Sequence, residues 1–150
     1  NEKYGEFSNW YQREFVIDDF RYFCVEQYMM AQKAKLFHDS VRYTAILRAN
    51  SPKDCKALGK QVTPFDAKVW DAVKYDIVKT GNKAKFEQNP DLMNLLLSTG
   101  DRIMAEASPK DKIWGIALDA ETAKHINPEA WPGQNLLGKI LMELKADWCI

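Results

Sequence analysis

Apolar residues recur along most of the chain at the spacing of amphipathic helices. This periodicity and the punctuation between segments predict six helices, at residues 25–37, 40–49, 52–58, 64–88, 90–98 and 134–146. Three of these starts pair a capping residue with a proline at the first helical position, namely Ser51-Pro52, Thr63-Pro64 and Asn89-Pro90. Gly59 and Gly100 stand where glycine commonly ends a helix.

Strand signals are fewer and lie on either side of this helical middle. Residues 15–17 and 20–22 flank Asp18-Asp19 and predict a small hairpin. Weak alternation at 102–107 and an apolar run at 113–118 indicate two further strands. The pattern therefore predicts one mainly helical α+β domain over residues 1–150, with a small β-sheet or hairpin.

Composition and charge exclude several classes of protein. The 150 residues carry 21 basic and 21 acidic side chains, so bulk charge does not favour binding along a nucleic-acid backbone. No apolar run approaches the roughly 18 residues of a membrane helix. Three cysteines without a CxxC pair, and no leading apolar segment, favour a reducing cytoplasmic location. Two distant histidines predict no metal site.

The predicted helix 25–37 places two opposite charges on its apolar face. Glu26, Met30, Lys33 and Phe37 fall along one stripe at about 100° per residue. One interpretation is a structural Glu26–Lys33 ion pair, or a lysine that extends its ammonium to water. The other is the floor of a cleft, in which Glu26 is a tuned acid or base beside Lys33.

Two tryptophan segments also carry alternative interpretations. Trp70 fits a core stripe with Val73 and Ile77. In the segment 106–115, Asp111 can bond a ligand, Trp114 can stack on it, and Gly115 lets a flat molecule approach the backbone. The structural alternative for this segment is a capping aspartate and a core tryptophan.

The run 133–139 matches the spacing GxxxxGK but is not a phosphate-binding P-loop. A P-loop needs Ser or Thr at the next position and a strand before it, whereas here Ile140 follows and Trp131-Pro132 precedes. Gly133 and Asn135 can still shape a helix N-terminus that receives an anion.

An ordered set of motifs resembles the NADAR (YbiA-like) family. The matching stretches, in family order, are residues 5–10, 25–34, 84–86, 99–101, 106–115 and 131–138, together with Trp70. The resemblance covers nearly the whole chain and implies a mainly helical α+β fold with N-glycosidase activity. YbiA-like members hydrolyse the C–N bond of ribosylamino-pyrimidine phosphates, which are intermediates of riboflavin biosynthesis. Other members remove ADP-ribose from modified guanine bases.

The resemblance also assigns candidate site residues. Glu26, Trp70 and Asp111 fall on active-site positions of the family, and Lys33 and Trp114 lie in the same motifs. We therefore expect Glu26, Asp111 and Lys33 to be catalytic. We expect substrate to be bound by five residues: Trp70, Trp114, Gly115, Asn9 and Asn135.

N-glycoside hydrolysis passes through an oxocarbenium-like transition state, which a carboxylate near C1′ stabilises. The expected chemistry thus needs no metal or cofactor, and the expected partner is a small ribosyl-pyrimidine. Lys33 has a second possible role as an amine that attacks C1′ of an opened ribose. Two other functions stay open: an ADP-ribosyl hydrolase, for which nucleic acid is a candidate substrate, and a non-catalytic nucleotide-binding module.

Overall fold

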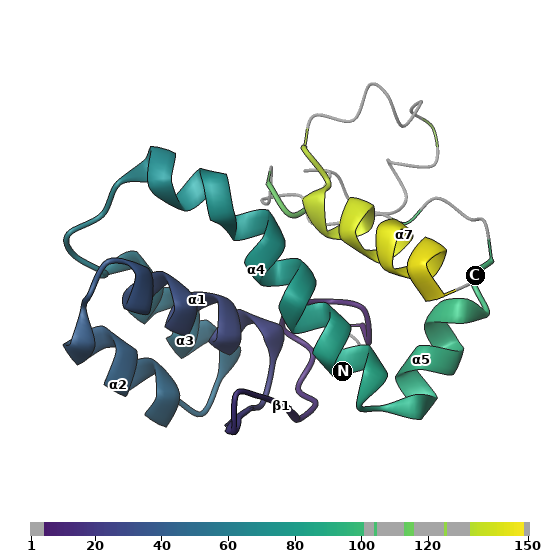
Figure 1. Cartoon of the computed structure of the whole chain (residues 1–150), viewed down its shortest axis with the longest axis horizontal. Helices are drawn as coiled ribbons and strands as arrows, with labels where there is room; N and C mark the ends of the chain where they lie inside the picture. Colours follow the sequence, from purple (N-terminus) through teal and green to yellow (C-terminus); the bar gives the residue numbers. More distant parts are fainter. Residues whose placement is uncertain (1–4, 101–103, 105–112, 116–124, 126–132, 149–150) are drawn as a thin grey trace. The chain divides into compact units, whose positions relative to one another are not determined.

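The computed structural model describes residues 5–100, 104, 113–115, 125 and 133–148. The chain divides into two compact units, residues 1–95 and 96–150, and each is described by itself. The first unit contains β1 (Phe15–Ile17), β2 (Phe20–Tyr22), α1 (Val25–Leu36), α2 (Ser40–Arg48), α3 (Pro52–Lys60) and α4 (Ala67–Glu87) (Figure 1). The unit boundary falls within α5 (Pro90–Leu97), and the second unit contains α7 (Leu136–Trp148).

Helix α1 is the centre of the first unit, because it packs against α2, α3 and α4. Two glycines allow this close packing. A Cβ at Gly59 would overlap the Met30 side chain, and a Cβ at Gly81 would press on Tyr28 and Val25. Gly59 was expected to end a helix. It instead lies inside α3, where its missing side chain admits Met30.

The start of α4 differs from the prediction by three residues. Asp66, rather than Thr63, caps this helix, since its carboxylate accepts hydrogen bonds from the backbone N–H groups of Lys68 and Val69. Thr63 precedes a cis peptide bond and donates its N–H to Asp39 at 3.0 Å. The helix then continues through Gly81 without a break, because tertiary packing outweighs the weak helix propensity of glycine.

The predicted hairpin is present. β1 and β2 pair antiparallel, with Phe15 opposite Tyr22. Asp18 and Asp19 both adopt positive φ, as a tight two-residue turn requires. The buried rings of Phe15 and Tyr22 pack with Tyr28 of α1, which attaches the hairpin to the helical core. The fold class predicted from the sequence, α+β and mainly helical with a small sheet, is therefore confirmed.

In the second unit, a short bend caps α7. Residues 113–115, which were expected to begin a strand, form this bend instead. Their carbonyl groups accept hydrogen bonds from the N–H groups of residues 135–137. At the other end of α7, Lys145 Nζ donates to Thr99 Oγ1 at 2.8 Å and to the Gly100 carbonyl at 2.9 Å. Apart from Met104, the predicted strand 102–107 lies outside the described residues.

Candidate active site

Glu26 lies in the first turn of α1 and is 5% exposed. Its backbone N–H donates to the Asn9 carbonyl at 3.0 Å. Cys24 lies two residues before Glu26 and caps the helix. Its sulfur accepts a hydrogen bond from the backbone N–H of Gln27. A carboxylate at this position is favoured by the helix dipole, so the fold can keep an acidic side chain on an otherwise apolar surface.

A buried polar network holds the loop that precedes α1. Asn82 of α4 donates to Asn9 Oδ1 at 3.2 Å and to the Val78 carbonyl at 3.0 Å. Lys85, which has no exposed surface, donates to the Ser8 carbonyl at 3.0 Å. The buried Asn9 is thus joined to α4 through its side chain and to Glu26 through its carbonyl.

Sequence reasoning did not select Asn82 or Lys85 as functional residues. The available signal was their position on the buried stripe of a long helix, where a polar side chain needs a partner. They contact the candidate site through the loop that carries Asn9, and their role is to hold that loop.

Lys33 lies two turns beyond Glu26 on the same face of α1 and is half-buried. Burial lowers the pKa of Lys33. The Glu26 carboxylate raises this pKa, but by less than burial lowers it, so the pKa of Lys33 lies below its ordinary value. The two charges thus lie on one helix face, as the spacing predicts, and their pairing remains a prediction. A lysine with a lowered pKa holds more neutral amine at neutral pH than an ordinary lysine does.

Two aromatic rings face the Lys33 amine. Its Nζ lies 5.9 Å from the centre of the Trp70 ring and 4.7 Å from the centre of the Phe65 ring. Trp70 is buried, as a core tryptophan is, yet the same ring contacts the charged face of α1. Phe65 was not selected from the sequence. The only local signal was a large apolar residue directly before the capping residue Asp66.

The candidate residues of the second unit make a different kind of contact. The carbonyls of Trp114 and Gly115 accept from Leu137 and Asn135, at 3.2 and 2.9 Å. Asn135 adopts φ 52°, and its side-chain amide donates to the Met104 carbonyl at 2.9 Å. These interactions join the bend 113–115 to α7. The N–H groups of residues 135–137 donate to carbonyl groups of residues 113–115 so, contrary to the expectation from the sequence, they cannot also bind an anion at this helix N-terminus.

Asp111 lies outside the described residues. Its assignment as a second carboxylate therefore remains a prediction that rests on the sequence.

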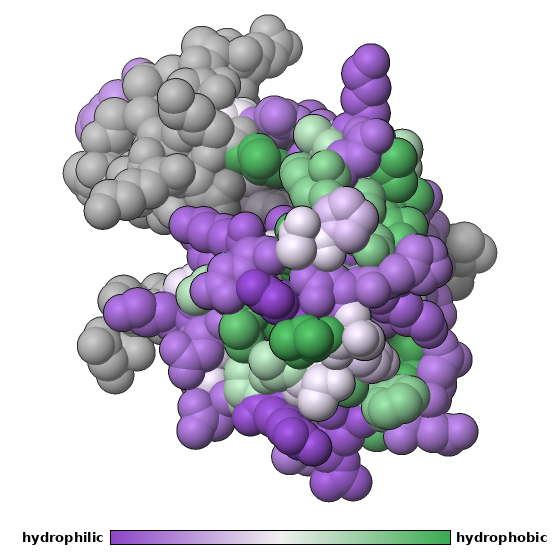
Figure 2. All heavy atoms as spheres, turned by 90° about the vertical axis from the view of Figure 1, so that its left-hand side faces the viewer, coloured by the Kyte–Doolittle hydropathy of each residue, from purple (hydrophilic) through white to green (hydrophobic). Residues whose placement is uncertain are grey.

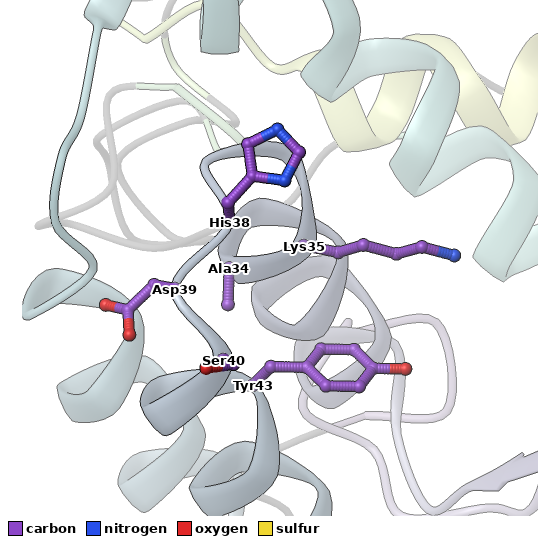
Figure 3. A pocket seen from close by; sticks show the side chains of 6 residues that line it. All are labelled: Ala34, Lys35, His38, Asp39, Ser40 and Tyr43. Carbon is purple, nitrogen blue, oxygen red and sulfur yellow. The ribbon is translucent and has the colours of Figure 1, made fainter.

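A surface cavity of about 290 Å³ lies where α1 ends and α2 begins, and none of the candidate residues lines it (Figure 3). Figure 3 shows Lys35 and Tyr43 pointing to one side and Asp39 to the other. Both Asp39 oxygens accept backbone N–H groups, from Arg42 and Thr63. Because its polar side chains diverge or are engaged, we do not treat this cavity as the active site.

Metal and thiol chemistry find no support in the part of the chain that the structure describes. Within these ranges no three His, Cys, Asp or Glu side chains form a group that could hold a metal ion. Cys24 and Cys55 are fully buried, and burial raises the pKa of each thiol to about 12. Neither is therefore a thiolate nucleophile at neutral pH. No described helix is both long and apolar enough to cross a membrane.

The described residues thus combine a mainly helical α+β fold with a carboxylate and an amine on α1, and two aromatic rings from other segments face that amine. The sequence model of the NADAR domain matches residues 1–148. An N-glycosidase of Acanthamoeba polyphaga mimivirus is 46% identical over 146 residues, covering 94% of this chain and 86% of that relative. An N-glycosidase of Nostoc punctiforme is 32% identical over 146 residues, covering 97% and 86%. The chain belongs to the NADAR family.

The solved structures agree with this assignment. The NMR structure of the Escherichia coli protein YbiA superposes with a TM-score of 0.80 at 30% identity, covering 98% of this chain and 79% of that chain. The expectation of a hydrolase that cleaves N-glycosidic bonds is confirmed at the level of class by the names of the relatives.

Proposed function

We propose that this protein hydrolyses the ribosyl C1′–N bond of ribosylamino-pyrimidine phosphates. The observation that carries the proposal is the charged face of α1. There the buried Glu26 acts electrostatically on Lys33, whose amine faces the rings of Trp70 and Phe65. A negative charge, a titratable amine and flat apolar surfaces are what a ribosylamine with a planar base requires.

The Glu26 carboxylate has the chemistry to assist departure of the base. As the C1′–N bond breaks, its electron pair leaves with the base and positive charge develops on the sugar. A carboxylate near C1′ stabilises that charge or removes a proton from the attacking water. Water then supplies the oxygen at C1′, and the departing nitrogen takes up a proton. A buried carboxylate performs this task better than an exposed one, since less water screens its charge.

Lys33 contributes in one of two ways. As an ammonium it pairs with the substrate phosphate. As a neutral amine, favoured by its lowered pKa, it attacks C1′ of a ring-opened ribose. The base then leaves with the electron pair of the C1′–N bond and takes up a proton, and water hydrolyses the resulting Lys33 imine to free the lysine and the sugar aldehyde. Trp70 supplies a ring face against which a pyrimidine can stack.

The remaining assignments follow from the family resemblance and form part of the proposal. Asp111 is the second carboxylate, and Trp114 and Gly115 form a wall for the base. Asn9 and Asn135 complete the substrate contacts. A single functional domain over residues 1–150 and a cytoplasmic location belong to the same proposal.

The alternative is an ADP-ribosyl hydrolase acting on guanine bases, which also breaks a ribosyl C1′–N bond. The balance of 21 basic and 21 acidic side chains favours a small substrate over a nucleic-acid duplex.

The test offers both substrate classes to one protein preparation. Purified protein is incubated with ribosylamino-uracil phosphate and, separately, with guanine-ADP-ribosylated DNA, and the released base is quantified by mass spectrometry. We expect release of the pyrimidine and at least about 100-fold slower release from DNA, a discrimination of the size that a dedicated pocket provides. Faster release from DNA would establish the alternative, and no release from either would leave a binding module.

A further inference from the structure

The segment between α3 and α4 presents one aromatic side chain to the charged face of α1. Val62 of this segment is buried, and Thr63 is tied to Asp39, so the chain is anchored just before Phe65. Asp66, immediately after, caps α4. The backbone on both sides of Phe65 is therefore held in place.

The ring of Phe65 lies near Lys33 of α1 and near Phe37, the residue that caps the C-terminus of α1. The Lys33 Nζ is 4.7 Å from the ring centre, and the Phe37 ring is 5.2 Å away at an interplanar angle of 63°. Trp70, from the first turn of α4, faces the same amine at 5.9 Å. The amine thus meets two rings that come from separate segments of the chain.

Phe65 is far more exposed than the other two aromatic residues, Phe37 and Trp70. It is 47% exposed, whereas Phe37 and Trp70 are 9% and 8% exposed. The 61–66 segment lies at the left edge of Figure 1 and so faces the viewer in Figure 2, where apolar side chains lie open among polar ones. Folding alone does not require an aromatic residue here, because half of its surface remains in water.

We propose that Phe65 is a positioning residue for the Lys33 amine, holding Nζ beside Trp70 where it acts on the substrate. This role rests on the proposed function, since it matters to catalysis only if Lys33 acts in the site. A lysine side chain has four rotatable bonds and loses much conformational freedom when it is fixed. The attraction of its ammonium to a ring face selects one direction for that chain. Without the Phe65 ring, the amine samples positions away from the sugar.

The first test observes the amine itself and does not depend on turnover. In protein labelled with ¹³C-lysine, the ε-methylene signals of Lys33 are identified by their loss in Lys33→Arg. Ring currents should displace these signals in the wild type. Phe65→Leu, which keeps an apolar side chain without a ring, should move them toward the position of exposed lysines. Phe65→Tyr should not.

A matched control is available in the hairpin. Phe20 is 49% exposed and lies on β2, so Phe20→Leu removes an equally exposed ring elsewhere. This control should leave the Lys33 signals and the activity unchanged. Unchanged Lys33 signals in Phe65→Leu would overturn the proposal.

The second test is kinetic and uses ribosylamino-uracil phosphate. Phe65→Leu should lower kcat about 10-fold with KM nearly unchanged, the effect of a misplaced reacting group. Phe65→Tyr should restore turnover to within about twofold, and Phe65→Leu should add nothing to the defect of Lys33→Met. Equal kcat in Phe65→Leu and the wild type, or a full 10-fold further loss in the Lys33→Met background, would contradict the role. If the wild type itself turns over no substrate, the proposed function fails while the NMR result still decides whether Phe65 holds the amine.

Discussion

The charged face of α1 and the cap of α7 both contain motif residues, but they use them differently. On α1, the Glu26 carboxylate raises the pKa of Lys33, and the Lys33 amine faces two aromatic rings. At the start of α7, the backbone carbonyls of Trp114 and Gly115 accept N–H groups of the helix, and Asn135 donates to the Met104 carbonyl. The first region arranges functional groups, whereas the second joins a bend to a helix.

This difference separates two reasons for a motif to exist. A motif that brings titratable side chains together in a partly buried site can support catalysis, because burial shifts their pKa values. A motif that forms backbone hydrogen bonds instead stabilises the course of the chain. Substitutions on the α1 face should therefore act mainly on turnover, and substitutions in the cap of α7 mainly on stability.

The largest effect is expected at Lys33. Lys33→Met keeps an unbranched side chain beside Phe65 and Trp70 but removes the titratable amine. Turnover of ribosylamino-uracil phosphate should fall about 10²–10⁴-fold, the range for loss of an acid, base or nucleophile. Steady-state kinetics measure it. A Lys33→Met protein with at least half the wild-type kcat would place the amine outside the chemistry.

A somewhat smaller effect is expected at Trp70. Trp70→Leu retains an apolar side chain but removes the ring surface, worth about 1 kcal/mol in aromatic stacking. The KM for the pyrimidine substrate should rise about fivefold, because 1.4 kcal/mol corresponds to tenfold. The KM should not change if Trp70 is only a core residue, and only the thermal midpoint would then fall.

The cap of α7 should respond mainly in stability. Asn135→Ala removes the hydrogen bond to Met104 and places alanine at positive φ, which should lower the free energy of unfolding by about 1–3 kcal/mol. Asn135→Gly accepts this φ and should lose less. Chemical denaturation measures both variants. Because Asn135 is also proposed to contact the substrate, the KM per folded Asn135→Gly molecule should rise, and an unchanged KM would leave Asn135 a structural residue only.

The smallest effect is a pH dependence of stability. Burial lowers the pKa of Lys33 in the folded state, so the folded protein disfavours the ammonium that the unfolded chain keeps up to about pH 10.4. The unfolded state then binds more protons between these two pKa values, and stability rises with pH across that window. The wild type should thus gain stability relative to Lys33→Met as pH increases from neutral toward 10.4. A difference that is flat with pH would contradict the lowered pKa.

Much of the fold was readable from the sequence because helix punctuation is local. Ser51 caps α3 as its Ser-Pro pattern predicts, and the Asp18-Asp19 hairpin is present. The start of α4 was misplaced because Thr63-Pro64 resembles a cap, whereas Thr63 bonds to Asp39, 24 residues earlier in the chain. That choice depends on a tertiary contact which no local pattern contains.

The candidate site was predictable to a similar extent. Helical periodicity placed Glu26 and Lys33 on one face of a helix, and both residues lie on α1, where the Glu26 carboxylate raises the pKa of Lys33. Phe65 and the Asn82–Asn9 bond were not predictable, since both join segments distant along the chain. Glu26 and Lys33 share a helix, whereas Phe65 reaches them only through the path of the chain between α3 and α4.

The most direct test of the central claim is the turnover of Glu26→Gln per folded molecule. This change keeps the shape of the side chain but removes its charge and its acid–base function. If Glu26 acts in the transition state, kcat should fall about 10²–10⁴-fold with KM nearly unchanged, while the thermal midpoint stays close to that of the wild type. If Glu26 is only a buried partner of Lys33, the variant should unfold more easily and each folded molecule should turn over at the wild-type rate, which would contradict the catalytic role of the α1 face.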